Sequence, residues 1–599
     1  MKSDLQADSA PPQTAAIADE SIGSWWASSR GVWVNAAILA VALLILLPVL
    51  DRGGLVYTDE GVYVAQTRSV AAGSWVPRRP VPQVDLEGHW NAAHTTAVVG
   101  DRYVPYQFHP TFIALLVPFW NAGGERGMLV LSVIGTWGAA VSCALLARRI
   151  RPRFGVLALW LLGLGSPLVF DSYLIVAHSI AAALCGVALL GISRATDDRR
   201  LSSLIWCLPA VALLVTVRSE GVLVMGAAAG VVSLSAISGV FHRPDPQAEH
   251  VDWRALWTGV AVGVTALGAY FLDVLLRSVA FPSAQSTSNP IKFVLGEGTG
   301  PVDAIWASVF RPWTQDGRMA QSGLILAMCC LVLGAIVIRV APRRQLLAVA
   351  LVLMGAVAAI VQQFGDQSLI TGLVAAFPVL PAGFILLRSR DLKDPLTVRL
   401  LGISALSSVA LILTIWDVGG SFEWGGRYFH VLLPLLVPVI VVGLDRGYHA
   451  LSRTMAPLAA GAVLIVVALF SASALRTEES IRSYTKELVD STVAFASERS
   501  ENGKPLVVIG LMSNIGWSRF LLAHADEFDT LSSYGVADAF RVAYQAKRHG
   551  YGSVIVLSDL APPLQARFAE ASLDQLGWRL LESKESAVEG YTFYRYGSV

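Results

Sequence analysis

Long uncharged apolar runs recur along the chain as far as residue 475, and each is about 20 residues long. A run of that length crosses a hydrocarbon core of roughly 30 Å as an α-helix. We therefore predict a mainly α protein, a polytopic transmembrane helical bundle of about 13 spans. The expected spans lie near residues 32–50, 127–147, 154–171, 173–193, 203–217, 221–240, 255–277, 321–338, 345–364, 369–388, 398–416, 428–444 and 455–475.

Two further segments have the pattern of helices that lie along a membrane surface. Residues 58–72 begin with Thr58 as a cap, carry Asp59 and Glu60 in the first turn, and then repeat apolar residues at helical spacing. A proline-rich flap follows. The apolar stretch 109–120 is too short to span, so we interpret it as a re-entrant or second interfacial helix.

After residue 476 the pattern changes to that of a soluble domain. Short apolar runs at 505–510, 553–557 and 591–596 predict strands, and amphipathic stretches at 478–497 and 537–549 predict helices. Strands that alternate with helices indicate a C-terminal α/β domain. The segment that follows the first strand contains no glycine-rich nucleotide motif. We therefore expect no cofactor there.

Composition supports the membrane assignment, because 54% of the residues are hydrophobic and only 15% are charged. A net charge of +1 argues against a nucleic-acid partner, which would require a concentrated basic face. All five cysteines lie in predicted spans, so none is expected to form a disulfide in the soluble domain.

Basic residues in alternate loops predict the orientation, because cytoplasmic loops are rich in Arg and Lys. This rule places the N-terminus in the cytoplasm and both the first long loop and the C-terminal domain outside it. We expect a disordered cytoplasmic tail over 1–30, a transmembrane catalytic domain over 31–475 with an outer loop at 51–108, and an extracytoplasmic α/β domain over 476–599. The cytoplasmic loops contain Arg148, Arg149, Arg151, Arg153, Arg194, Arg199, Arg200, Arg339, Arg343, Arg344, Arg388, Arg390, Lys393 and Arg399.

Several short motifs occur in a recognisable order. Asp59 and Glu60 follow the first span with Tyr63, and Gly73-Ser74-Trp75-Val76-Pro77-Arg78 follows the interfacial helix. His109-Pro110 then introduces an apolar segment, and Gly426-Arg427-Tyr428 opens a late span. With these motifs the chain resembles the membrane-integral GT-C glycosyltransferases, specifically the branch around the protein O-mannosyltransferases and the aminoarabinose transferase that modifies lipid A.

The resemblance implies a polyprenyl-phosphate-linked sugar donor, a lipid, glycan or protein acceptor that approaches from the outer face, and inversion at the anomeric carbon. Membrane lipids are the remaining expected partners. On this resemblance Asp59 matches the first-loop catalytic aspartate of the family, with Glu60 beside it, and Asp171 matches its second acidic position. The family often carries a lysine near the position of His109, and this chain departs from that pattern.

Physical chemistry suggests roles for the same residues. Displacement at an anomeric carbon needs a base for the acceptor hydroxyl, and Asp59 is the candidate. The lipid phosphate is a good leaving group that cations stabilise, which favours Arg427 over His109 and Arg218 because a guanidinium stays charged near lipid. The residues predicted to contact the sugar or the acceptor are Tyr63, Trp424, Tyr428 and Glu423.

Structural roles are alternatives for each of these residues. Asp59 and Glu60 are common helix-capping charges, Asp171 would suit the end of a helix, and Arg427 would snorkel to headgroups. Aromatic residues near a span end are also typical of the membrane interface. Three further groups are expected to be structural or merely polar: an Arg218–Glu220 turn, an Asp273–Arg277 ion pair, and a set of metal-ligand types without a metal signature at Asp85, Glu87, His89 and His94.

Two other classes of function remain open. A transporter or flippase of lipid-linked saccharides predicts polar residues deep in several spans, whereas the clearest charges here gather toward span ends. A polymerase or ligase of surface polysaccharide concentrates its charges in a late outer loop rather than after the first span. A purely structural scaffold leaves the acidic pair and the long first loop unexplained.

Overall fold

The structure is a computed structural model that describes most of the 599-residue chain. The described residues are 28–598 except 52, 80, 86–89, 91–96, 105–108, 239–250, 282–300, 313–321, 366–368, 415–423, 498–505, 512–519, 523–528, 534–535, 559–572, 574–575 and 587–590.

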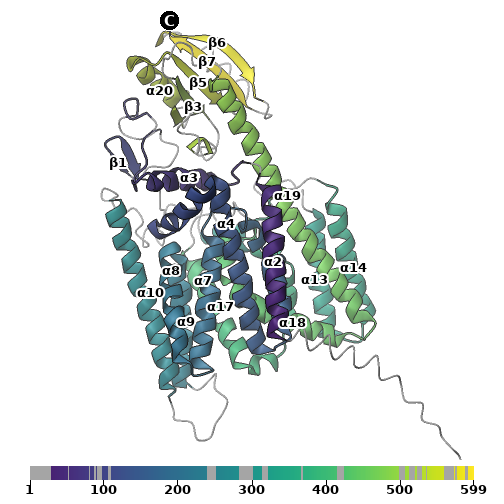
Figure 1. Ribbon diagram of the computed structural model, residues 1–599. Helices are drawn as coiled ribbons and strands as arrows, with labels where there is room; N and C mark the ends of the chain where they lie inside the picture. Colours follow the sequence, from purple (N-terminus) through teal and green to yellow (C-terminus); the bar gives the residue numbers. More distant parts are fainter. Residues whose placement is uncertain are drawn as a thin grey trace, which may run out of the picture.

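A helical bundle forms the larger part of the molecule (Figure 1). Within the described residues, ten helices are long and apolar enough to cross a membrane, which confirms a multi-pass membrane protein. They include α2 (Ser29–Leu50), α4 (Pro110–Ile150), α7 (His178–Thr196), α9 (Glu220–Ser238), α10 (Trp253–Ala280), α13 (Ser322–Val340), α14 (Gln345–Gln362), α17 (Pro395–Thr414), α18 (Leu433–Ala450) and α19 (Met455–Ser497).

Of the other three predicted spans, 154–171 and 369–388 are each divided into shorter helices, whereas 203–217 occurs as the helix Leu201–Val217. The segment 154–171 forms α5 (Phe154–Gly163) and the single turn α6 (Leu168–Asp171), and 203–217 forms η1 (Leu201–Ser203) and α8 (Leu204–Val217). The segment 369–388 divides into α15 (Leu373–Ala376) and α16 (Val379–Leu386), with Phe377 and Pro378 between the two pieces. Proline lacks the N–H that a continuous helix would bond, which accounts for this last interruption.

The first half of α4 is the short apolar helix that the sequence predicted before the second span. The two halves are divided at Gly123 and Gly124, whose backbone is not helical. Gly124 has a φ of 60°, in the region that favours glycine. Arg126, just after the break, pairs at 2.5 Å with Asp51 at the end of α2. This contact ties the second half of α4 to the first span.

The helix α3 (Thr58–Ala71) lies across one end of the bundle, between the spans and the C-terminal sheet (Figure 1). Its extent confirms the predicted surface helix to within a residue. Thr58 is not the cap, because the N-cap residue is Tyr57, whose N–H donates to Glu60 Oε2 at 2.8 Å. Asp59 and Glu60 occupy its first turn, as expected.

The C-terminal domain contains a five-stranded sheet in the order β4-β3-β5-β7-β6. The strands β4, β3 and β5 are parallel, and β7 and β6 are antiparallel additions. The three predicted strands and the predicted helix α20 (Val536–Arg548) are confirmed, whereas β4 and β6 were not predicted. The strands are β3 (Leu506–Leu511), β4 (Asp529–Ser533), β5 (Ser553–Ser558), β6 (Trp578–Glu585) and β7 (Thr592–Ser598).

A continuous helix links the two parts of the molecule. The last span and the first helix expected in the C-terminal domain form the single helix α19, which rises from the bundle to the sheet (Figure 1).

The flap that follows α3 contains the hairpin of β1 (Ala97–Val99) and β2 (Arg102–Val104). Val81 and Val84 of this flap pack in one cluster with residues of α20 and β5. The flap therefore packs against the C-terminal domain.

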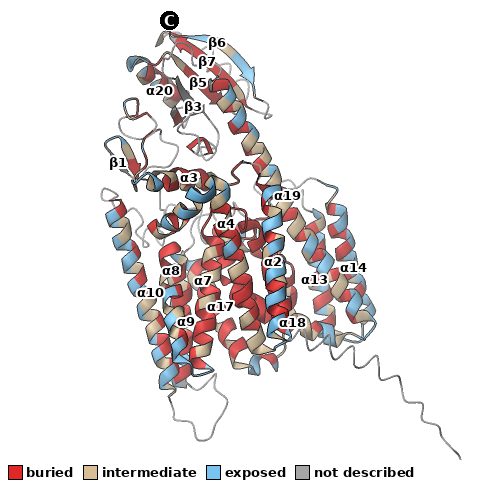
Figure 2. Ribbon diagram, in the orientation of Figure 1, coloured by how far each residue is buried: buried red, intermediate tan, exposed pale blue. Residues whose placement is uncertain are grey.

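Burial follows the expectation for a bundle in lipid. Buried residues fill the interior, whereas the outer faces of helices such as α10 and α14 are exposed (Figure 2). The exposed positions are apolar, for example Val264 at 67% and Phe271 at 62%. Such faces suit a hydrocarbon environment rather than water.

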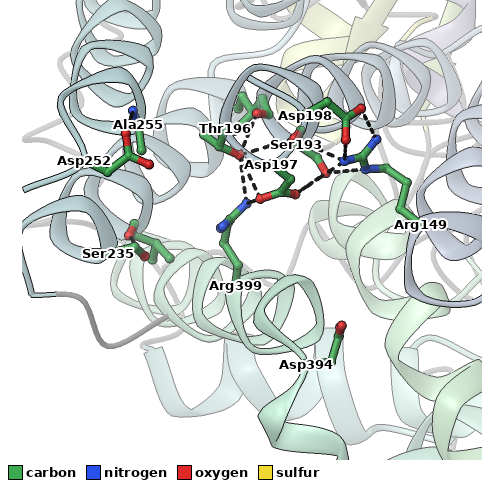
Figure 3. A network of polar contacts seen from close by, with 12 residues as sticks. Arg149, Ser193, Thr196, Asp197, Asp198, Ser235, Asp252, Ala255, Asp394 and Arg399 are labelled. Carbon is green, nitrogen blue, oxygen red and sulfur yellow. Dashed lines mark hydrogen bonds and ion pairs between the residues drawn. The ribbon is translucent and has the colours of Figure 1, made fainter. Parts of the chain in front are cut away.

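A polar network joins the C-terminal ends of α4 and α7 to the first turns of α17 (Figure 3). Arg149 of α4 donates two hydrogen bonds to Asp198 at 2.7 and 2.8 Å. Arg399 of α17 donates to Thr196, the last residue of α7, at 2.9 Å and to Asp197, which follows it, at 2.8 Å. Paired guanidinium and carboxylate groups of this kind fix the helix ends relative to one another.

Candidate active site

Asp59 and Arg427, the predicted base and the predicted phosphate ligand, form an ion pair. Arg427 Nη1 lies 3.8 Å from Asp59 Oδ2. Asp59 belongs to the first turn of α3, and Arg427 begins the 3₁₀ helix η5 (Arg427–Leu432) ahead of α18. The two side chains keep exposed fractions of 34% and 19%. Both are therefore partly accessible at the end of the bundle that carries α3.

A tight turn presents Arg427 to Asp59. Gly425 and Gly426 have φ values of 82° and 68°, which side chains rarely adopt. A Cβ on Gly426 would lie 1.9 Å from the carbonyl oxygen of Ser308, so only glycine fits there. The Arg427 guanidinium lies 5.2 Å from the ring centroid of Tyr428, a cation–π distance. Arg427 thus contacts both the Asp59 carboxylate and the Tyr428 ring.

Asp171, the predicted second acidic residue, is completely buried. Its Oδ2 lies 2.5 Å from Nδ1 of His430, which is also fully buried. The other ring nitrogen of His430, Nε2, donates to the Gly425 carbonyl at 3.1 Å. Asp171 is therefore joined to the turn before Arg427 and is not exposed to a ligand in this structure.

A second arginine approaches the same place from the loop between α8 and α9. Arg218 donates to Glu220 from Nε at 3.1 Å and from Nη2 at 2.5 Å, which confirms the expected paired turn. It also bonds the ring of His178, whose edge faces His430 at a centroid distance of 6.1 Å. Arg218 lies within electrostatic range of Arg427. These contacts connect two arginines and two histidines, and one of the arginines, Arg427, pairs with Asp59.

His109, the third predicted phosphate ligand, is bound to other side chains. Its Nδ1 lies 3.1 Å from Asp273 Oδ2 and 2.8 Å from Arg277 Nη2. Asp273 and Arg277 form the predicted ion pair at 2.5 Å. Burial is the main cause that lowers the pKa of His109 below its usual 6.5, although Asp273 opposes the change. A neutral ring offers little attraction to a phosphate.

Glu60, predicted as catalytic beside Asp59, is fully buried and bound to backbone. Its Oε2 accepts from the N–H groups of Val56 and Tyr57 at 2.6 and 2.8 Å, and its Oε1 accepts from Ile175 at 2.7 Å. Burial raises the pKa of Glu60 above 4.5, while the Arg482 charge and the three donors lower it. The capping interpretation therefore fits Glu60, and we assign it a structural role.

A buried ion pair on α19 supports the same region. Arg482 and Glu478 are 1% and 0% exposed and pair at 3.2 Å. Arg482 also donates to the carbonyl of Gly54 at 2.6 Å and to that of Tyr173. These bonds fix the loop before α3 and the segment after α6. Arg482 was not predicted, because the two carbonyl groups that it contacts, those of Gly54 and Tyr173, are distant in sequence.

The predicted sugar and acceptor contacts have different surroundings. Tyr63 packs edge-on against Phe112 with ring centroids 5.2 Å apart, and Tyr428 lies beside Arg427. Trp424 is only 1% exposed and stacks on Phe170 at 6.3 Å, so the structure places it in the core rather than against a ligand. Glu423 lies outside the described residues.

Of the possible metal ligands in the flap, only Asp85 is described, because Glu87, His89 and His94 lie outside the described residues. Asp85 is 3% exposed and accepts from the Trp90 N–H at 3.1 Å. Two further residues of the site, His178 and His430, were not predicted, although a lone histidine in the apolar run Phe429–Leu432 was a usable signal.

No family model and no curated protein matches the sequence. Solved structures match its fold. ArnT from Cupriavidus metallidurans in the apo state is 14% identical with a TM-score of 0.50, and the match covers 95% of this chain and 98% of that one. The Archaeoglobus fulgidus oligosaccharyltransferase in the apo form is 12% identical with a TM-score of 0.51, over 95% and 74% of the two chains. At such low identities the likeness establishes a common fold.

Proposed function

Because the chain has the GT-C fold of membrane glycosyltransferases, we propose that it moves one sugar from a polyprenyl phosphate to a lipid, glycan or protein acceptor. The observation that carries this proposal is the meeting of Asp59 and Arg427 at 3.8 Å beside a surface-lying helix. A base and a phosphate-binding cation are the two groups that such a transfer needs. The name of the oligosaccharyltransferase neighbour agrees with saccharide transfer.

The proposed reaction is a single displacement with inversion. Asp59 takes the proton of the acceptor hydroxyl, and the hydroxyl oxygen forms a bond to the anomeric carbon. The bond from that carbon to the phosphate oxygen breaks, and the polyprenyl phosphate leaves with the electron pair. Arg427 binds the phosphate through its planar fork, and Arg218 adds a second positive charge within range.

The proposed orientation places this site outside the cytoplasm. The arginines that the positive-inside rule assigns to the cytoplasm include Arg149 and Arg399, which lie in the network at the C-terminal ends of α4 and α7. The C-terminal domain then lies outside and contributes to acceptor binding. A reporter active only outside the cytoplasm, fused after Val599, tests the orientation. Activity of the same reporter only in the cytoplasm contradicts it.

Lipids that co-purify with the protein test the donor class. We expect mass spectrometry to detect a polyprenyl phosphate, or its glycosylated form, with the purified wild-type protein. The Arg427→Ala variant is expected to retain much less of it, whereas Arg343→Ala, which removes an exposed arginine before α14, is expected to retain the wild-type amount. Phospholipids alone in all three samples would contradict the proposal. A flippase would instead translocate such a lipid without consuming its sugar.

A further inference from the structure

Asp171 and His430 form a buried pair that touches the turn before Arg427 on one side and the support of α3 on the other. Both residues are fully buried, so neither reaches a ligand in this structure. The 3₁₀ helix η5 places His430 three residues after Arg427, a spacing at which side chains lie on the same side. His430 therefore lies on the same side of η5 as Arg427, and its ring contacts the Gly425 carbonyl of the turn that precedes Arg427.

Hydrogen-bond chemistry defines the direction of this contact. The Gly425 carbonyl only accepts, so His430 Nε2 donates the hydrogen bond at 3.1 Å. Nδ1 then either donates to an ionised Asp171 as part of an imidazolium or accepts from a protonated Asp171, at 2.5 Å. In both forms Asp171 fixes the ring and selects the nitrogen that donates to Gly425.

The segment that carries Asp171 also holds α3. Ile175, four residues after Asp171, donates its N–H to Glu60 at 2.7 Å, and the Tyr173 carbonyl accepts from Arg482. Glu60 is the neighbour of Asp59 in the first turn of α3. One buried segment, residues 171–175, therefore contacts the supports of both Asp59 and Arg427.

We propose that Asp171 acts as a positioning residue, which holds the Gly425–Gly426 turn through His430 and so sets Arg427 against the donor phosphate. This inference rests on the proposed function, because it assigns Arg427 the phosphate. It differs from the role implied by the family resemblance, since Asp171 neither transfers a proton nor contacts the sugar. The segment 171–175 then sets the distance between base and cation.

Backbone amide exchange tests the positioning without any ligand. The amides of Gly425 and Phe429 are bonded to Ile370 and Gly426 at 3.0 Å, so they report on the turn. We expect faster exchange in Asp171→Ala, and also in His430→Asn, whose amide replaces Nδ1 but does not reach Gly425. Ser404→Ala is the matched control, because its buried hydroxyl donates to the Leu400 carbonyl within α17 and lies outside the segment 171–175. Unchanged exchange in both variants overturns the proposal.

Asp171→Asn separates positioning from a charged role and is nearly isosteric, which limits misfolding. Its amide N–H donates to a neutral Nδ1, so Nε2 keeps its proton for Gly425. We expect exchange close to wild type and affinity for undecaprenyl phosphate within about threefold, against a loss of about tenfold or more in Asp171→Ala. Equal losses in the two variants overturn the proposal, because a charge rather than a hydrogen bond would then act.

A double variant tests whether Asp171 acts through Arg427. Asp171→Ala combined with Arg427→Ala is expected to bind undecaprenyl phosphate no more weakly than Arg427→Ala alone. Additive losses overturn the inference, because they place Asp171 on the ligand. Failure of the wild-type protein to bind undecaprenyl phosphate would contradict the proposed donor class instead, and amide exchange would still decide the positioning.

Discussion

Arg427 Nη1 lies 3.8 Å from Asp59 Oδ2, although the two residues are far apart in the sequence. Asp59 follows the first long helix of the bundle, α2, and Arg427 precedes the second-last, α18. The pair joins α3, which lies across the end of the bundle, to the glycine turn ahead of α18. A carboxylate and a guanidinium within ion-pair distance attract each other whatever their function. Their shared exposure beside Arg218 and Tyr63 is what makes this pair a candidate site.

Arg427→Ala is expected to raise the donor concentration needed for half-maximal transfer by about tenfold to a hundredfold, since charge-assisted hydrogen bonds contribute roughly 1.5–3 kcal/mol. Arg427→Lys keeps the charge without the planar fork, so an intermediate value is expected. Initial rates measured over a range of donor concentrations check both. A donor dependence equal to that of the wild type in Arg427→Ala would remove the phosphate role.

Glu60→Gln is expected to lower stability rather than to act on chemistry directly. The glutamine has one acceptor oxygen in place of two, which leaves one or more of three buried backbone N–H groups unpaired. Such a loss costs about 1–3 kcal/mol. Thermal unfolding in detergent is expected to show a lower midpoint, with little change in Asp59→Asn as the neighbouring control. An unshifted midpoint in Glu60→Gln would argue against the capping role.

The lowered pKa of His109 predicts a pH dependence of stability. The unfolded chain binds a proton at about pH 6.5, whereas the folded protein resists it, so stability is present above that pH and is lost as the pH falls. We expect the thermal unfolding midpoint of the wild type to decrease as the pH is lowered below about 6.5. The fall is expected to be smaller in His109→Gln. Parallel profiles for the two proteins would contradict this assignment.

Removal of Arg482 from its buried pair with Glu478 is expected to be among the most destabilising single changes near the site. Arg482→Met leaves Glu478 buried without its partner, at a cost of about 3–5 kcal/mol. Lys486 on the same helix forms an exposed pair with Asp490, and Lys486→Met is expected to cost about 0–1 kcal/mol. Unfolding midpoints of the two variants provide the comparison, and equal midpoints would show that the buried pair has no special weight.

The sequence predicted the helices well because apolar length is a local property. Ten of the expected spans occur, and α3 agrees with its prediction to within a residue. The division of the expected span at 369–388 was missed even though Pro378 is visible there, because apolar composition alone suggested a continuous helix. The strands β4 and β6 were missed because β4 is short and polar and β6 is exposed at most positions on both of its faces.

The site was only partly predictable, because burial and partners depend on distant segments. The motifs selected Asp59 and Arg427, which the fold brings together. Glu60 and Trp424 were predicted as site residues too, and only the packing around α3 and Phe170 shows that both are buried. His430 and Arg482 have partners hundreds of residues away, so no local pattern indicated their contacts.

The most direct test of the account is the turnover of Asp59→Asn in reconstituted vesicles that contain the donor lipid. A general base contributes about a hundredfold to ten-thousandfold, so we expect transfer to fall by that factor while protein abundance and lipid binding remain near wild type. Asp303→Asn, which neutralises an exposed carboxylate of α12 (Pro301–Ile305), is expected to keep full turnover. Wild-type turnover in Asp59→Asn would contradict the central claim and place the base elsewhere.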